Sequence, residues 1–441
     1  AVPAGTQANF AYDAGAGRVR TQLSVETPGG APSPLVALYP HQWAALDPSE
    51  SDVAPAPYTY RSPRGPMHLV KGRRIVTTHR YGGIVPFLPL GDAADLEELR
   101  RLLQDALDAP LWPLGIGSDR YDTYLVGKSL NRIAQLVGIA EQLGDAAARD
   151  LLLAELKARL ERWFTVPELR PEGAGPADEF FWYDSGWGAL IGHPTSHGAG
   201  SDLNDHHFHY GYFVHAAGIV ALYDPAWASD EAWGGMVKLL ARDFACLERS
   251  GDRFPRLRCF DPFAGHSWAS GTALFQEGNN QESSSEAIHA WAGLILFGEA
   301  TGDRALRDLG VWGYAVETHA AWHYWFDASG SAFPPGYPCK VIARLFGSGG
   351  DRDTWWTRHP VEAHGINVLP LTGASLYLGA HPERARAILS GLWDETGGRI
   401  GHWADIIYGF LALVDPDAAW KAWPLPGPVE FGETRAHTYH W

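Results

Sequence analysis

The sequence predicts a mainly α-helical protein, an α/α toroid preceded by a short β-rich region. Apolar residues recur at helical spacing from Ala93 onward, whereas residues 1–92 mix β-branched and aromatic residues with glycine and proline. The helical segments follow one another in pairs, and no strand pattern separates them. Paired helices without intervening strands pack on one another, and a closed ring of such pairs is the natural arrangement. A solenoid is the alternative, but the sequence has no repeat of fixed period.

The elements follow in order along the chain. Residues 28–57 are rich in proline and alanine and are expected to form a surface loop, and residues 73–89 read as strands and turns. The first amphipathic helix is expected from Ala93, with leucines near helical spacing at Leu96, Leu99, Leu102, Leu103 and Leu107. Further helices are predicted over residues 121–144, 146–163, 204–223, 230–249, 282–301, 303–327, 361–379, 382–394 and 402–413. We therefore divide the chain into a β-rich region (1–92), a helical toroid (93–425) and a tail that packs on it (426–441).

Composition narrows the class of function. The formal net charge of −16 argues against nucleic acid as the main partner, because phosphate contacts need clustered Lys and Arg. No run approaches the roughly 18 apolar residues that a membrane-spanning helix requires. The chain has 19 Trp, 17 Tyr and 18 Phe, and aromatic rings stack on the apolar faces of sugars. Most of these rings are expected in the core, where aromatic side chains bury large areas, but the remainder suit a carbohydrate-binding cleft.

A first polar segment lies at the start of the helix predicted from residue 204. Asn204 or Asp205 can cap this helix, which places Asp205 and His209 on one face of its first turns. Asp205 has three interpretations: a helix cap, a metal ligand together with neighbouring histidines, or a catalytic carboxylic acid. The interpretation as a metal ligand is the weakest of the three, because no pair of histidines with i, i+4 spacing lies at the start of the helix.

A second polar segment starts the helix predicted from residue 282. Asn279 or Asn280 can cap it, and Glu282 and Glu286 are four residues apart, so they are expected to share a face. A solvated surface position is the alternative for both glutamates. Acidic residues at a helix N-terminus stay ionised, because the helix dipole favours negative charge there, and an ionised carboxylate can act as a base.

Two such segments meet the requirement of glycoside hydrolysis, which needs two carboxyl groups in opposite protonation states. Glu282 would activate water and Asp205 would protonate the leaving oxygen. The pKa of Asp205 must then be raised by burial or by nearby glutamates, although its own helix N-terminus acts in the opposite direction. The sequence does not decide which of these opposite effects on the pKa of Asp205 is larger.

The segments around these residues resemble glycoside hydrolase family 81, the inverting endo-β-1,3-glucanases. The resemblance runs in order through YDTYLVGK (121–128), GHPTSHGAGSDLNDHHFHYGY (192–212), FDPFAGHSWASG (260–271), NNQESSSEA (279–287), GINVLPLT (365–372) and HTYHW (437–441). ALYPHQW (37–43) resembles the family's β-rich region. The resemblance implies an (α/α)6 toroid preceded by a β-sandwich, which in the family is much longer than the residues that precede the first predicted helix here.

The resemblance also implies roles for individual residues. Asp205 matches the general acid, Glu282 the general base, and Glu286 an assisting carboxylate. His209 matches a residue at the cleavage subsite, and the further substrate-binding candidates are Tyr183, Asp184, His266, Trp268, Asn280 and Gln281. Inversion predicts carboxyl groups about 6.5–9.5 Å apart. No cofactor or metal is implied, and we expect a secreted monomer that acts on laminarin-like or curdlan-like glucan.

Two other classes of function remain open at this point. A polysaccharide lyase could use the same toroid, although it would need basic residues to neutralise a uronic acid, which the acidic balance disfavours. A non-catalytic glucan-binding protein could use the aromatic rings for stacking and the carboxylates only for hydrogen bonds. The presence of carboxylates at two helix starts disfavours this second class.

Overall fold

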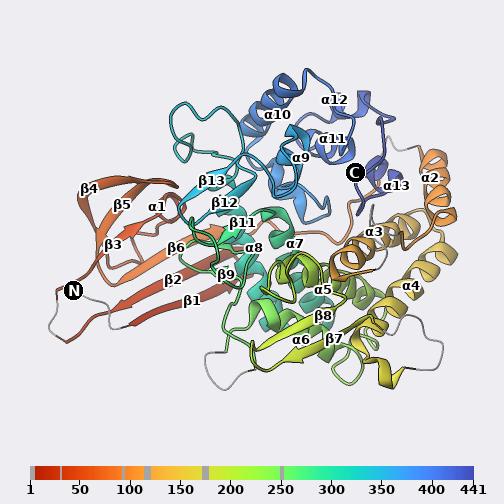
Figure 1. Ribbon diagram of the computed structural model, residues 1–441, viewed down its shortest axis with the longest axis horizontal. Coiled ribbons are helices and arrows are strands. Elements are labelled where there is room, and N and C mark those ends of the chain that lie inside the picture. The colour runs from red at the N-terminus through yellow and green to blue at the C-terminus, as the bar shows by residue number, and fades with distance from the viewer. Residues whose placement is uncertain (1–4, 30–31, 92–94, 114–120, 171–177, 249–252) are drawn as a thin grey trace.

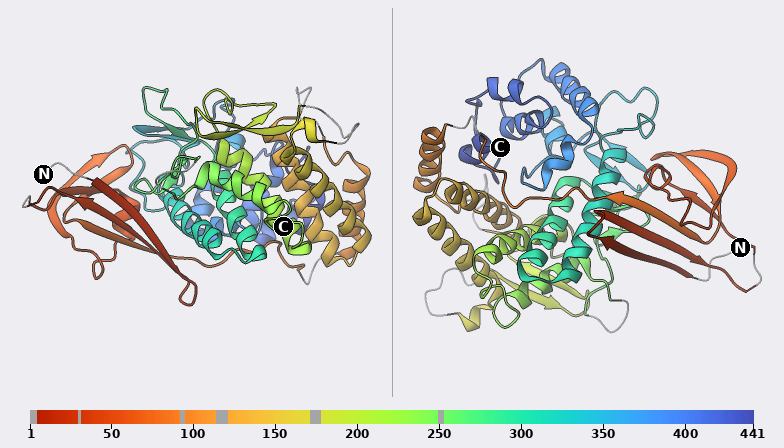
Figure 2. Two further views of the ribbon diagram at one scale, coloured as in Figure 1. Left: turned by 90° about the horizontal axis from the view of Figure 1, so that it is seen from below. Right: turned by 180° about the vertical axis from the view of Figure 1, so that it is seen from behind.

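The computed structural model describes residues 5–29, 32–91, 95–113, 121–170, 178–248 and 253–441. Strands β1 to β6 lie at one end of the molecule and the helices form the larger body beside them (Figures 1 and 2). The expected start of the first helix at Ala93, and with it the 92/93 boundary, lies outside the described residues, as does residue 249 at the end of another predicted helix. Within the described ranges, no helix is both long enough and apolar enough to cross a membrane.

The N-terminal region forms two antiparallel three-stranded sheets. The first has the order β1 (Gly5–Asp13), β2 (Arg18–Glu26), β6 (Arg74–Arg80), and the second has the order β3 (Leu35–Leu38), β5 (Gly65–Lys71), β4 (Ala54–Ser62). A small apolar core joins them through Leu23, Leu38, Val70 and Ile75. The expected surface loop over residues 28–57 is therefore wrong in part, because it contains β3, the start of β4 and the short helix α1 (Pro40–Ala44). Its prolines are compatible with these elements, since Pro suits the first turn of a helix and edge strands such as β4.

The helices from Leu96 to Ala412 follow the predicted order, whereas two short helices after it, Pro416–Lys421 and Arg435–His440, were not predicted. These helices are α2 (Leu96–Asp108), α3 (Thr123–Gln142), α4 (Ala146–Phe164), α5 (His206–Tyr223), α6 (Gly234–Ala245), α7 (Ser284–Thr301), α8 (Arg304–Tyr324), α9 (Pro360–Gly365), α10 (Pro382–Thr396), α11 (Ala404–Ala412), α12 (Pro416–Lys421) and α13 (Arg435–His440). Aspartates cap several of them: the side chains of Asp122, Asp145 and Asp303 accept hydrogen bonds from main-chain N–H groups of α3, α4 and α8.

Two further predictions about secondary structure are wrong. The helix expected over residues 361–379 ends at Gly365 and resumes only as a 3-10 turn at Ser375–Gly379, because Pro370 has no N–H to continue it. Short strands also lie between the helices, in a hairpin of β7 (Phe180–Asp184) and β8 (Ala189–His193), a pair β9 (Phe260–Asp261) and β10 (His266–Ser267), and a sheet of β11 (Asn280–Gln281), β12 (Arg344–Phe346) and β13 (Gly349–Asp351). Strands β9 to β13 have two or three residues, too few to show a period of two, and β7 and β8 show no alternation of polar and apolar residues.

Helices α3, α5, α7 and α8 pack in series, and α13 at the end of the chain contacts α2 and α3. Nearly every residue of α5 and α7 is buried, which explains why neither helix has the polar stripe of a surface helix. The C-terminal segment is tied to α3 by a buried ion pair between Lys128 Nζ and Glu430 Oε1, 2.6 Å apart. The N-terminal sheets dock on α8, where Trp312 stacks on Phe10 of β1 and donates a hydrogen bond to Thr21 of β2.

Glycine allows α5 and α7 to approach closely. A Cβ added to Gly211 of α5 would lie 2.6 Å from Cβ and 2.8 Å from Cα of Ala290 in α7. Because the backbones of both helices are buried, neither can move away without disturbing the core. Gly293 of α7 approaches His215 of α5 in the same way, with a built Cβ 2.9 Å from its main-chain nitrogen.

We predict that Gly211→Ala lowers the free energy of unfolding by about 1–3 kcal/mol, the usual cost of overpacking a core. Chemical denaturation measures this change. Gly82→Ala is the matched control, because a Cβ at that position meets no atom within 4 Å. Equal stabilities of the two variants would contradict the close approach of α5 and α7.

Candidate active site

A cleft of about 440 Å³ lies where α3, α5 and α7 begin. Tyr124 comes from the first turn of α3, and Asp205 and His209 come from the start of α5. Glu286 comes from the first turn of α7, and Glu282 from the residues just before that helix. The rest of the lining includes aromatic and polar side chains from the connecting loops: His197, Asn204, Phe208, Phe275, Asn280, Trp355 and Trp356. The cleft thus combines carboxylates with aromatic rings, as a polyhydroxylated ligand requires.

Asp205 is held by the loop that leads into α5. Its backbone lies in the left-handed region (φ 61°), its N–H donates to the carbonyl of Ala269 at 2.8 Å, and its side chain makes no capping hydrogen bond to the helix. The next residue is anchored on both ring nitrogens, since His206 contacts Asp243 Oδ2 at 2.6 Å and the carbonyl of Ala199 at 2.9 Å. The interpretation of Asp205 as a side-chain cap is therefore wrong, and its carboxyl group is available to the cleft.

Burial, and then the charges of Glu282 and Glu286, hold the pKa of Asp205 well above its ordinary value. The sequence left burial and the helix end in conflict. Burial raises this pKa, and the side chain accepts no capping hydrogen bond from α5 that would stabilise its ionised form. A carboxyl group with a raised pKa keeps its proton at a pH where an exposed aspartate has lost it. Asp205 can therefore donate a proton.

Glu282 lies between β11 and α7 rather than within the helix. The helix begins at Ser284 with Ser283 at its N-cap position, so the expectation that Glu282 and Glu286 share a helix face is wrong. Instead, the chain turns from β11 into α7 and brings both side chains to the cleft. The caps expected at Asn279 or Asn280 are also wrong, because Asn280 belongs to β11.

Burial raises the pKa of Glu282 to about 7, opposed by a hydrogen bond of 2.8 Å from the main-chain N–H of Trp355 to its Oε1. Burial thus favours the protonated form of this carboxyl group, whereas the sequence led us to expect an ionised form. Glu286 is buried in the first turn of α7, and the hydroxyl of Tyr212 donates a hydrogen bond of 2.7 Å to its Oε1. The two glutamates therefore sit in different hydrogen-bonding environments.

The start of α7 is fixed by Asn367, from the loop after α9. Its Oδ1 accepts hydrogen bonds from the N–H (3.0 Å) and the hydroxyl (2.8 Å) of Ser284. Its amide nitrogen donates to the carbonyl of Ala343 at 3.1 Å. One buried amide side chain thus connects α7 to the end of the loop that precedes β12.

His209 lies against Thr123 and Tyr124 of α3. Its Nδ1 is 2.8 Å from the hydroxyl of Thr123, and its ring is 5.2 Å from the ring of Tyr124 and 5.7 Å from that of His197. Burial and the neighbouring histidines lower its pKa well below the ordinary value, so the imidazole is neutral. A neutral ring can both donate and accept hydrogen bonds to a hydroxylated ligand.

The predicted site residues divide into two groups. Asp205, His209, Asn280, Glu282 and Glu286 line one cleft. The lining of that cleft does not include the other five predicted residues: Tyr183, Asp184, His266, Trp268 and Gln281.

These five residues make contacts elsewhere. Asp184 accepts two main-chain hydrogen bonds in the turn of the β7–β8 hairpin, and Tyr183 donates to the carbonyl of Arg253. Two others pack around Arg64 of the N-terminal region, with Nε2 of His266 2.6 Å from its Nη1 and the ring of Trp268 5.1 Å from its Cζ. Gln281 is buried beside His207.

Five residues at the site were not predicted from the sequence: Tyr124, His197, Tyr212, Trp355 and Trp356. Tyr124 lies in the first turn of α3, within the motif YDTYLVGK, so its position at a helix start could have indicated the cleft. Trp355 and Trp356 lie in a long loop and are about half exposed (49% and 56%), which is unusual for tryptophan. His197 and Tyr212 have no comparable signal, because only the packing of α3, α5 and α7 brings them to the site.

We predict that Asn367→Ala lowers the free energy of unfolding by about 1–3 kcal/mol, because the buried N–H and hydroxyl of Ser284 lose their acceptor. Thermal and urea unfolding measure the change. Asn9→Ala, at an exposed position of β1, serves as the control and is expected to stay within about 0.5 kcal/mol of the parent. A neutral effect of Asn367→Ala would show that α7 does not depend on this side chain.

Comparison with known proteins identifies relatives of the chain. The model of the glycosyl hydrolase family 81 C-terminal domain matches residues 98–426. Two proteins named glucan endo-1,3-beta-D-glucosidase are similar, one from Acetivibrio thermocellus (46% identical, covering 92% of this chain and 51% of that protein) and one from Thermobifida fusca (44% identical, covering 99% and 56%). The chain spans about half the length of these relatives.

A solved structure is also similar to the whole chain. It is a mutant of a glycoside hydrolase family 81 protein from Clostridium thermocellum, 42% identical in sequence, with a TM-score of 0.91. The match covers 100% of this chain and 60% of the other. The described arrangement of helices and small sheets is thus one that a known family adopts.

Proposed function

Since this chain belongs to glycoside hydrolase family 81, we propose that it hydrolyses internal β-1,3-glucosidic bonds of β-1,3-glucan with inversion at the anomeric carbon. The observation that carries the proposal is the set of three carboxyl groups in one cleft, of which Asp205 and Glu282 have raised pKa values. The names of the two relatives support the choice of glucan as substrate.

In this proposal, Asp205 is the general acid and Glu282 the general base. Burial and two nearby glutamates keep Asp205 protonated, so it can transfer its proton to the departing glycosidic oxygen. Glu282, ionised above a pH of about 7, removes a proton from the water that attacks the opposite face of the sugar. Glu286, fixed by Tyr212, orients that water or the sugar. Inversion implies that Asp205 and Glu282 are far enough apart to hold the water between them.

Neighbouring side chains would bind the glucan. His209 and Asn280 line the cleft and offer hydrogen bonds to sugar hydroxyls, and the exposed rings of Trp355 and Trp356 offer stacking surfaces. For Tyr183, Asp184, His266, Trp268 and Gln281, a role in the wider substrate path stays a prediction from the family resemblance. The reaction requires only carboxyl groups and water, so we propose no cofactor.

We extend the proposal to the architecture of the protein, its location and its oligomeric state. The packing of α3, α5, α7 and α8 in series supports an (α/α)6 ring for residues 93–425, with residues 1–92 as a β-sandwich-like region. The contacts of α13 with α2 and α3 support the packing of residues 426–441 against that ring. We propose that the protein is a secreted monomer whose partner is the polysaccharide, in keeping with its net charge of −16.

Incubation with laminarin tests the proposed reaction directly. We expect new reducing ends and a mixture of oligosaccharides, and proton NMR in the first minutes should show the α-anomer, because inversion of a β-bond gives an α-product. The β-anomer as first product would contradict inversion. Products that absorb in the ultraviolet would indicate a lyase, and binding without new reducing ends would indicate a glucan-binding protein.

We predict that Glu282→Gln and Asp205→Asn each lower kcat on laminarin by about 10²–10⁴-fold, the usual contribution of a general acid or base. The reducing-sugar assay measures this loss, and circular dichroism verifies folding. Glu277→Gln is the control, because Glu277 is exposed in the same segment outside the cleft lining and should leave kcat unchanged. Substantial residual activity of Glu282→Gln in a folded protein would exclude its role as base.

The dependence of kcat/KM on pH should follow the two carboxyl groups. Because Glu282 acts in its ionised form, kcat/KM should fall about tenfold per pH unit below a pH of about 7. Because Asp205 acts in its protonated form, activity should fall again once the pH exceeds its raised pKa. Initial rates at low laminarin concentration measure both limbs, and a flat profile between about pH 5 and 8 would contradict the assignment of the base.

A further inference from the structure

One residue of the loop between β13 and α9, Trp355, contacts Glu282. The main-chain N–H of Trp355 donates to Glu282 Oε1 at 2.8 Å, and its indole N–H donates to Asn280 Oδ1 at 3.3 Å. Both acceptors belong to the short segment that leads from β11 into α7. Trp355 is therefore attached to this segment by its main chain and by its ring, although half of its surface is exposed.

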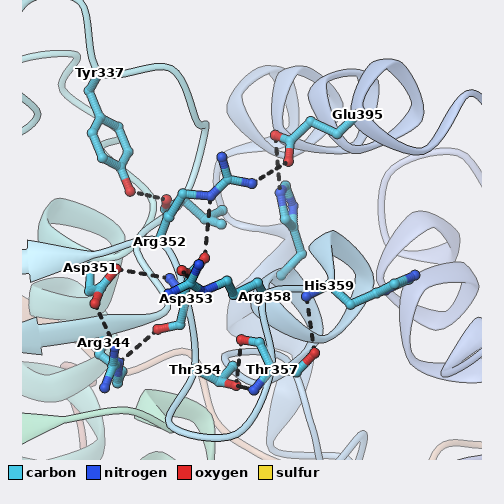
Figure 3. A network of polar contacts seen from close by, with 12 residues as sticks. Tyr337, Arg344, Asp351, Arg352, Asp353, Thr354, Thr357, Arg358, His359 and Glu395 are labelled. Atoms are coloured by element: carbon cyan, nitrogen blue, oxygen red, sulfur yellow. Dashed lines mark hydrogen bonds and ion pairs between the residues drawn. The ribbon is translucent and has the colours of Figure 1, made fainter.

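Arg344 of β12 holds the ring of Trp355 in place. Its guanidinium carbon lies 4.0 Å from the centre of that ring, which is a close cation–π contact. Its Nε donates to the carbonyl of Asp353 at 2.7 Å, and its Nη2 donates to Asp351 Oδ2. Figure 3 shows Arg344 below Asp351 and Asp353. A planar guanidinium can stack and bind two acceptors at once, which a lysine ammonium cannot do.

The remaining ion pairs of the loop are peripheral. Arg352 and Arg358 approach the carboxylate of Asp353 at 3.4 and 3.3 Å, and Arg352 approaches Glu395 of α10 at 3.7 Å (Figure 3). Their side chains are 44% and 90% exposed, whereas that of Arg344 is 10% exposed. Exposed ion pairs contribute little, so Arg344 is the cation with the strongest effect on the loop.

We propose that Arg344 is a positioning residue for Glu282, acting through the ring and the main-chain N–H of Trp355. It does not touch the cleft; its effect on Glu282 is to keep the Trp355 N–H directed at Oε1. The inference rests on the proposed function only in taking Glu282 as the base. The contact itself can be tested without any substrate.

The electrostatics agree with this geometry. Burial raises the pKa of Glu282, while the Trp355 N–H and then the charge of Arg344 lower it. The other charged groups that face Glu282 are Glu286 of α7, which raises its pKa, and Asp205, which is protonated. Loss of Arg344 would remove its charge and loosen the N–H donor, and both changes favour the protonated form of Glu282.

The test measures the pKa of Glu282 in Arg344→Met, Arg344→Lys, Trp355→Ala and Arg352→Met by 13C NMR of glutamate labelled at its carboxyl carbon. The Glu282 resonance is the one that Glu282→Gln lacks. We expect Arg344→Met to raise the pKa by about one unit, as loss of a nearby opposite charge does. Arg344→Lys should raise it less, because the charge remains while the stacked plane is lost. Arg352→Met, the control from the exposed rim of the same loop, should leave it unchanged.

Trp355→Ala keeps Arg344 but removes the ring through which it acts, so it should also raise the pKa of Glu282. No change in Arg344→Met, no change in Trp355→Ala, or an equal change in Arg352→Met would each overturn the proposal. If laminarin is hydrolysed, the acid limb of kcat/KM should move upward by the same amount. If laminarin is not hydrolysed, the proposed function fails, but the NMR titration still decides the role of Arg344.

Discussion

The close packing of α5 against α7 is the constraint on which the site depends. Both helices are buried on almost every side, and the carboxyl groups of the cleft lie at their N-terminal ends. Glycines at positions 211 and 293 let the two backbones approach until a single methyl group would collide. The N-terminal ends of both helices therefore meet at a fixed separation, and the cleft carries the carboxyl groups of Asp205, Glu282 and Glu286 from those ends.

The same burial sets the protonation states. Removing carboxyl groups from water raises the pKa of Asp205 and Glu282, and nearby negative charges raise them further. Hydrogen bonds then distinguish the groups. Glu282 receives a main-chain N–H and lies near a guanidinium, Glu286 receives a tyrosine hydroxyl, and Asp205 receives no such donor from its own helix. A carboxyl group that donates a proton, Asp205, and one that accepts a proton, Glu282, can thus lie in the same cleft.

Supports from distant parts of the chain keep these helix ends in place. Asn367, after α9, binds the first residue of α7, and Arg344 of β12 holds the loop that contacts Glu282. The C-terminal segment contributes through Glu430, whose buried ion pair with Lys128 lies one turn beyond Tyr124 on α3. Such an ion pair adds little net stability, but removing one partner would leave an uncompensated buried charge, so the segment is firmly held.

Most of the helices and the identity of the central carboxylates could be predicted from the sequence. Leucine spacing and capping aspartates indicated the helices well, because amphipathic periodicity and capping are local properties. The sequence did not reveal the break at Pro370 within a predicted helix, the strands β7 to β13, or the two sheets of the N-terminal region in full. The N-terminal sheets and the sheet of β11, β12 and β13 depend on pairing between distant segments, whereas β9 and β10 are too short to carry a period. Strands β7 and β8 show no alternation of polar and apolar residues. The break at Pro370 had a local signal, because proline cannot continue a helix.

The sequence by itself determined which residue types are available at the helix starts, and the resemblance of its motifs determined the family. Only the tertiary structure decided that Asp205 is no cap, that Glu282 precedes its helix, and that Trp355 and Arg344 act on it. It also decided the direction of the pKa shifts of Asp205 and Glu282. From the sequence, burial and a helix end were expected to shift these pKa values in opposite directions. The physical reason is that a pKa depends on desolvation and on charges brought together by folding, and neither quantity can be computed from positions along the chain.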